Sequence, residues 1–173
     1  MKKNNITTLI TTRLHLRALS IDDDEDIFSL RSNKEVNTFV KREPCKTIDD
    51  ARIFINKVLA SAKKIEVYYW AITLKEADKL IGTICLANYC FETLTAEIGY
   101  ELLPTFQNKG FIQESIIKVI DFGFEALQLN NIEANVDAAN IKSIYILEKH
   151  GFLKNTISQE STQKNYIKYI QYR

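Results

Sequence analysis

The chain has 173 residues, of which 46% are hydrophobic and 26% are charged, a composition typical of one folded domain rather than of a disordered chain. Its 23 lysines and arginines balance 22 aspartates and glutamates, so the basic excess of a nucleic-acid-binding domain is missing. No apolar stretch approaches the roughly 20 residues that cross a bilayer, and the N-terminus lacks the apolar segment of a secretory signal. We expect one cytoplasmic domain over residues 1–173, without a nucleic-acid or membrane partner.

The cysteines and histidines offer little material for a metal site or a disulfide framework. The chain has an odd number of cysteines, and none of the three, Cys45, Cys85 and Cys90, forms a C-x-x-C pair. The two histidines, His15 and His150, do not cluster with them. We therefore expect reduced thiols and no bound metal.

The predicted elements begin with a strand and two helix starts. Residues 14–19 alternate apolar and polar side chains, as a strand does. The acidic run 22–26 follows Ser20, and carboxylates there suit the positive end of a helix, where we expect the run to be solvated. Thr47 and Asp50 have the spacing of a capping box, which predicts the start of another helix.

The rest of the chain alternates further strands with helices. β-branched and aromatic residues predict a hairpin, a third strand in series, and then helices between strands. The expected strands are residues 67–74, 80–89, 96–103, 132–136, 152–158 and 166–172. The remaining expected helices are residues 33–39, 111–127 and 140–150. This order indicates a mixed α/β or α+β domain around one central sheet.

The segment from Leu102 to Ile112 is the most informative one for function. It joins a strand to a helix, where backbone N–H groups and the helix dipole together suit a phosphate or pyrophosphate. Gly110 allows a close approach of the backbone or a positive φ, and Lys109 adds positive charge. An ordinary loop with one glycine has the same appearance, and neither the Walker A nor the Rossmann glycine pattern occurs.

Further motifs surround this segment in a fixed order. A-E-I-G-Y (96–100) precedes Q-N-K-G-F-I (107–112), and N-I-K-S (140–143) and E-K-H-G-F (148–152) follow. With the opening T-T-R-L-H-L-R (11–17), the chain resembles the GNAT superfamily of acetyl-CoA-dependent N-acetyltransferases, and most closely its RimJ/RimL-type branch. The resemblance covers nearly the whole chain.

The resemblance implies a strongly bent, mostly antiparallel sheet of about seven strands flanked by about four helices. Two neighbouring strands, here 96–103 and 132–136, are implied to splay apart and admit the pantetheine arm of acetyl-CoA. The first helices and the connection 34–49 are expected to shape the acceptor groove. The chain is expected to be a monomer or a homodimer.

The implied function is direct transfer of an acetyl group to a primary amine in a ternary complex, with release of CoA. The acceptor expected first is a protein N-terminal α-amine of the ribosomal-protein type. A polyamine, an antibiotic amine, a CoA-binding regulatory module without turnover, and a phosphate-binding domain for another nucleotide are the alternatives.

The resemblance also implies which residues bind the cofactor. Backbone groups of residues 100–103 would bind the arm, and N–H groups of residues 107–112 would bind the pyrophosphate. Asn140 and Ser143 would contact the arm and its sulfur. The full implied set is Tyr100, Glu101, Leu102, Leu103, Gln107, Asn108, Lys109, Gly110, Phe111, Ile112, Asn140 and Ser143.

The candidate catalytic residues are Glu97, Ser143 and Asn140. Glu97, Gly99 and Glu101 share one face of a regular strand. Glu97 would accept the proton of the amine through water or bind the cationic amine, unless both carboxylates are simply solvated. Ser143 would protonate or solvate the departing thiolate. Alternatively, Asn140 and Ser143 are plain helix-cap residues.

Two positions depart from the family pattern. Many members carry a tyrosine general acid directly before the E-K-x-G-F motif, where this chain has Leu147. Tyr145 lies two residues earlier, about 200° round the helix, and is expected to face elsewhere. Ser143 or water must then serve as the acid, or none is needed. Ile112 stands where glycine or alanine is usual, which tightens or tilts the approach to the pyrophosphate.

Overall fold

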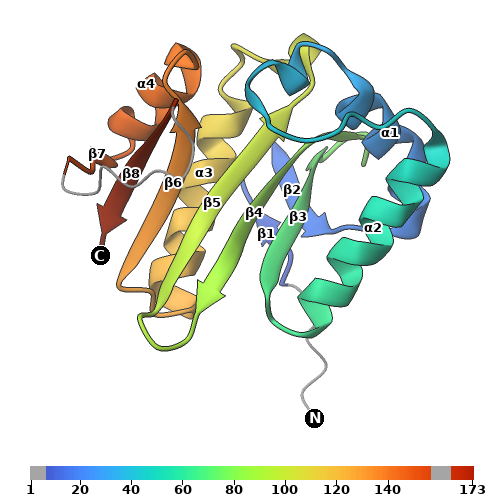
Figure 1. The fold of residues 1–173 in the computed structure, drawn as a ribbon. Helices are drawn as coiled ribbons and strands as arrows, with labels where there is room; N and C mark the ends of the chain where they lie inside the picture. Colours follow the sequence, from blue (N-terminus) through green and yellow to red (C-terminus); the bar gives the residue numbers. More distant parts are fainter. Residues whose placement is uncertain (1–6, 157–164) are drawn as a thin grey trace.

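The structure, a computed structural model, describes residues 7–156 and 165–173, within which eight strands form one sheet of order β1-β2-β3-β4-β5-β6-β8-β7 (Figure 1). Among the described strands, every neighbouring pair is antiparallel except β5 and β6. The strands are β1 (Leu9–Ile10), β2 (Leu14–Ala18), β3 (Val67–Leu74), β4 (Leu80–Cys90), β5 (Thr95–Leu102), β6 (Asn131–Asp137), β7 (Leu153–Lys154) and β8 (Tyr166–Tyr172). The helices are α1 (Asp24–Ser32), α2 (Ile48–Lys63), α3 (Phe111–Asp121) and α4 (Ile141–Lys149). The predicted mixed fold with a mostly antiparallel sheet is confirmed.

Three predicted elements differ from those observed. The helix predicted over 111–127 leaves α-helical geometry after α3 and continues as a π-helical segment, Phe122–Ala126. The helix predicted over 33–39 is a 3₁₀ turn at Val36–Phe39. Of the strand predicted over 152–158, only β7 forms, and residues 157 and 158 lie outside the described residues.

The π-helical segment packs closely against the sheet at Gly123. A Cβ added at Gly123 would lie 2.9 Å from Cδ1 of Ile132 on β6 and 3.2 Å from Cδ1 of Leu129. The absence of a side chain therefore permits this close packing, at the general cost of a glycine inside a helix.

Helices cover both faces of the sheet because side chains alternate along its strands (Figure 1). On β3, Tyr69 and Ala71 belong to the core under α1 and α2. The intervening Trp70 and Ile72 belong to the core that contains the apolar side chains of α3 and Leu147 of α4. Among the described helices, none combines the length and hydropathy needed to cross a bilayer.

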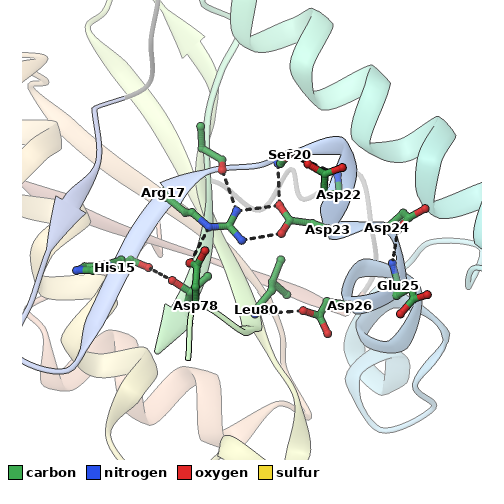
Figure 2. A network of polar contacts seen from close by, with 12 residues as sticks. His15, Arg17, Ser20, Asp22, Asp23, Asp24, Glu25, Asp26, Asp78 and Leu80 are labelled. Atoms are coloured by element: carbon green, nitrogen blue, oxygen red, sulfur yellow. Dashed lines mark hydrogen bonds and ion pairs between the residues drawn. The ribbon is translucent and has the colours of Figure 1, made fainter. Parts of the chain in front are cut away.

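An ion pair between the buried carboxylate of Asp23 and the partly buried guanidinium of Arg17 fixes the start of the first helix against β2 (Figure 2). Arg17 Nη2 and Nη1 lie 2.7 and 2.9 Å from the two carboxylate oxygens of Asp23, and its Nε lies 3.1 Å from Asp78. The hydrogen bond with Asp23 raises the pKa of Arg17. Asp23 also accepts from the N–H of Ser20 in a capping box. The predicted helix start is confirmed, but the expected solvation is wrong for Asp23, which is 6% exposed and compensated by the guanidinium.

Candidate functional site

Strands β5 and β6 pair only at their N-terminal ends. The parallel ladder joins residues 95–97 to residues 131–133, although β5 continues to Leu102 and β6 to Asp137. Beyond the ladder the two strands are not hydrogen-bonded to each other. The predicted separation of these two strands is confirmed.

The register of β4 and β5 decides which backbone groups of β5 face this gap. The N–H of Leu103 donates to the carbonyl of Ile81, and hydrogen-bonded pairs alternate along an antiparallel ladder. The backbone groups of Glu101 and Leu103 are therefore directed to β4, and those of Tyr100 and Leu102 to the gap. The carbonyl of Leu102 accepts from the side-chain amide of Gln107 at 3.1 Å. Within residues 7–156 and 165–173, this leaves both backbone groups of Tyr100 and the N–H of Leu102 free for a ligand.

The loop after β5 presents a run of unpaired amides. Within the described part of the chain, the N–H groups of residues 108–113 have no hydrogen-bond acceptor, whereas Gln107 N donates to Pro104 O. Asn108 and Gly110 have φ values of 59° and 79°. Left-handed residues placed between right-handed ones bring successive N–H groups together into an anion-binding concavity. Of the six loop residues predicted to offer an amide, Gln107 is the one whose amide is used by the protein.

An arginine outside the predicted site braces this loop. Arg13 Nη1 donates to the carbonyl of Lys109 at 3.0 Å, and its guanidinium carbon lies 4.4 Å from the ring centroid of Phe111. Its Nε pairs with Glu114 of α3 at 2.8 Å, and Glu114 also accepts from the hydroxyl of Thr11. Burial alone raises the pKa of Glu114, but these hydrogen bonds outweigh burial and hold the pKa below its usual value.

Two cavities meet beside the gap. The larger, of about 640 Å³, lies between β5, the loop after it and α4. The smaller, of about 320 Å³, is lined by β5, β6, the first two helices and part of the segment 34–49, which were expected to shape the acceptor groove. The residues that line both cavities are Phe39, Val40, Tyr100, Glu101, Asn140 and Ser143.

Two hydroxyl groups form a hydrogen bond at this junction. Tyr100 Oη lies 2.7 Å from Ser143 Oγ, and burial raises the pKa of Tyr100 to about 12 although the bond to Ser143 opposes the shift. Asn140 Oδ1 accepts from the N–H of Ser143 at 3.1 Å, so its oxygen caps α4, as the alternative interpretation predicted. Asn140 also lines both cavities, and within the described residues its Nδ2 takes no part in that cap.

Glu101 is held between two arginines. Its Oε2 lies 2.5 Å from Nη2 of Arg42 and its Oε1 lies 3.6 Å from Nη1 of Arg31. Oε1 also accepts from the hydroxyl of Thr83, which accepts from Tyr69 in turn. The Glu101 side chain is 9% exposed, and its charge is paired within the protein by these two arginines.

Glu97 lies on the same face of β5 and has a different environment. It lines the smaller cavity and, within the described residues, makes one side-chain hydrogen bond, accepted from Asn88 Nδ2 at 3.0 Å. Leu147 is buried against the smaller cavity, whereas Tyr145 is 60% exposed beside the larger one, so the predicted difference in direction is confirmed. The phenol at the junction comes from Tyr100 instead.

Comparisons with known proteins agree with this geometry. A family model described as an acetyltransferase (GNAT) domain matches residues 13–153. The uncharacterised N-acetyltransferase YoaA of Bacillus subtilis is 35% identical over 161 residues, which cover 93% of this chain and 91% of YoaA. The ribosomal-protein-S5-alanine acetyltransferase of Vibrio fischeri shares the fold with a TM-score of 0.83, 20% identity and coverage of 96% of each chain. The spermidine N-acetyltransferase of Vibrio cholerae, in complex with CoA and spermine, has a TM-score of 0.79, 23% identity and coverage of 92% of this chain and 95% of that one.

Proposed function

The chain belongs to the GNAT family of acetyltransferases, and from this premise we propose that it acetylates the N-terminal α-amine of a protein by direct transfer from acetyl-CoA. The observation that carries the cofactor part is the run of unpaired amides at residues 108–113 beside the gap between β5 and β6. The acceptor part rests on the charges that line the smaller cavity.

The residues present fit acetyl-CoA. Free amides at a helix N-terminus suit a pyrophosphate, and the free backbone groups of Tyr100 and Leu102 suit the amide-bearing arm. Acetyl-CoA supplies an acetyl thioester, whose thiolate is a fair leaving group because a thiol has a pKa near ~8.5. Asn140 would hold the arm with Nδ2, and Ser143 would face the sulfur.

The charges of the smaller cavity favour an acceptor with one amine. Among the residues that the structure describes, three carboxylates line it, those of Glu97, Glu101 and Asp137. Glu101 is neutralised by its arginines, whereas Asp137 keeps its charge and uses one carboxylate oxygen to accept from the N–H of Ala139 at 2.9 Å. Glu97 is left for one ammonium group, while the one positive charge by which Arg31 and Arg42 exceed Glu101 opposes the further ammonium groups of a polyamine.

The proton demand of the reaction agrees with an α-amine. An α-amino group has a pKa near ~7.7–8.0 and is partly neutral at pH 7, whereas a lysine-like amine near ~10.4 needs a stronger base. Glu97, acting through water, would remove the proton that the nitrogen loses as its bond to the acetyl carbon forms.

Release of CoA thiol over a matched amine panel tests this proposal. The panel contains a lysine-bearing peptide with a free N-terminus, the same peptide with a blocked N-terminus, and spermidine. We expect thiol release with the free N-terminus alone. Release with spermidine alone would overturn the acceptor assignment, and binding of acetyl-CoA without release in any arm would overturn the catalytic proposal.

A further inference from the structure

The hydrogen bond between Tyr100 and Ser143 joins two residues that are 43 positions apart in sequence. Tyr100 comes from β5 beside the gap, and Ser143 comes from the first turn of α4. Both line the two cavities, and under the proposed function the sulfur of a cofactor in the larger cavity would meet an amine in the smaller one beside them.

We propose that Tyr100 positions Ser143 so that the serine O–H donates a hydrogen bond to the departing sulfur of CoA. The inference rests on the proposed function and assigns the leaving-group contact to this pair. Tyr100 is a positioning residue in this scheme, and Ser143 is the group that touches the sulfur.

The direction of the hydrogen bond follows from the chemistry of the two hydroxyls. A phenol is more acidic than an aliphatic hydroxyl, so Tyr100 is the better donor and Ser143 the better acceptor. Within the described residues, Ser143 Oγ makes no other hydrogen bond. With its lone pair engaged by Tyr100, its own hydrogen is free to turn toward the cavity.

The pair acts by hydrogen bonding and does not give up a proton. Burial raises the pKa of Tyr100 to about 12, far above the ~8.5 of a thiol, so transfer of its proton to a thiolate is unfavourable. A hydrogen bond to the developing negative charge costs no proton and is stronger than one between neutral groups.

The proposed step balances without any further reactant. The amine nitrogen forms a bond to the acetyl carbon, and the carbon–sulfur bond breaks with its electron pair going to sulfur. One proton leaves the nitrogen through Glu97 and water, and the thiolate takes a proton from solvent after release. The hydroxyls of Tyr100 and Ser143 return unchanged.

The test combines a titration of bound CoA with kinetics. Ultraviolet absorbance reports the thiolate of CoA as the pH is raised in the complex. In the native protein we expect the bound thiol to titrate below ~8.5, because hydrogen bonds favour the charged form. Ser143→Ala raises this titration by about one to two pH units, and Tyr100→Phe raises it in the same direction.

Tyr169→Phe is the matched control. Tyr169 is buried, its hydroxyl donates to Glu148 at 2.9 Å, and its pKa is raised to about 12, as that of Tyr100 is, but it borders neither cavity. This variant loses one hydroxyl and one hydrogen bond, and we expect no change in the titration of bound CoA. A shift equal to that of Tyr100→Phe would overturn the inference.

The kinetic arm asks whether the two hydroxyls act as one unit. We expect Ser143→Ala and Tyr100→Phe each to lower kcat about 10-fold with the CoA affinity unchanged, and the double variant to fall no further than Ser143→Ala. If the two substitutions lower kcat independently, or if Tyr100→Phe keeps the native titration and kcat, this inference is overturned while the proposed function stands. A native protein without turnover would overturn the proposed function, while the titration would still test the pair.

Discussion

The substitution Gly110→Ala tests the anion-binding loop most directly. Gly110 has a φ of 79°, and the left-handed conformation costs a residue with a Cβ about 1–2 kcal/mol. Space is not the obstacle, because the added Cβ would lie 3.4 Å from Nη2 at the end of the Arg13 side chain. The free loop of the variant relaxes to a negative φ, and the cofactor must restore the turn. The dissociation constant of CoA, measured by calorimetry, therefore rises about 5–30-fold.

Gly151→Ala is the matched control for this prediction. Gly151 ends α4 with a φ of 84°, and a Cβ there would lie 3.5 Å from the Gln171 side chain, so the backbone penalty is the same. It borders neither cavity. We expect a lower melting temperature with unchanged affinity for CoA. If both variants bind CoA as the native protein does, the amides at residues 108–113 do not hold the cofactor.

Three further substitutions test other parts of the structure. Asp23→Asn removes the buried charge that pairs with the partly buried guanidinium of Arg17 and leaves it only the exposed Asp78, so we expect the free energy of unfolding in urea to fall by about 2 kcal/mol. Asp22→Asn, on the exposed side of the same turn, stays within about 0.5 kcal/mol, and equal losses would contradict the role of the Asp23 pair. The pKa of Glu114 is lower in the folded than in the unfolded protein, so its contribution to stability is complete above about pH 4.5 and is lost as the pH falls. We therefore expect the melting temperature of Glu114→Gln to fall less steeply than that of the native protein as the pH is lowered below 4.5. An equally steep fall would refute the role given to Glu114. Glu97→Gln lowers kcat for an α-amine peptide about 100-fold with native affinity for CoA, and a loss of affinity without a loss of kcat would place Glu97 with the cofactor instead.

Local patterns predicted the parts of the fold that depend on neighbouring residues. The capping box at Thr47 and Asp50 forms as its spacing indicates, with both reciprocal hydrogen bonds present. Strand alternation correctly put Glu97 and Glu101 on one face, where both line the smaller cavity. The alternation of side chains along a strand does not show which other elements pack against each face. It therefore did not reveal that Arg31 and Arg42 pair with the carboxylate of Glu101.

Side-chain contacts between segments that are distant in the chain could not be predicted from the local patterns of a single sequence. Arg13 and Glu114 are 101 residues apart, and neither belongs to a motif that predicts the other. Tyr100 and Ser143 each stand in a motif, but the motif for Tyr100 directs attention to its backbone. The bond between their side chains depends on how α4 packs beside the gap, which only the assembled sheet determines.

Strand β5 explains how the proposed reaction can proceed without a tyrosine at position 147. The backbone of Tyr100 faces the gap and would set the position of the arm, while its phenol holds Ser143. The sulfur and the donor that stabilises it would thus be positioned by one residue on a strand fixed by its ladder to β4. Because the ladder to β4 fixes β5, the phenol of Tyr100 would hold Ser143, the donor on α4, in a defined position beside the sulfur. Leu147 is then free to fill space, and its burial against the smaller cavity is the role that the structure gives it.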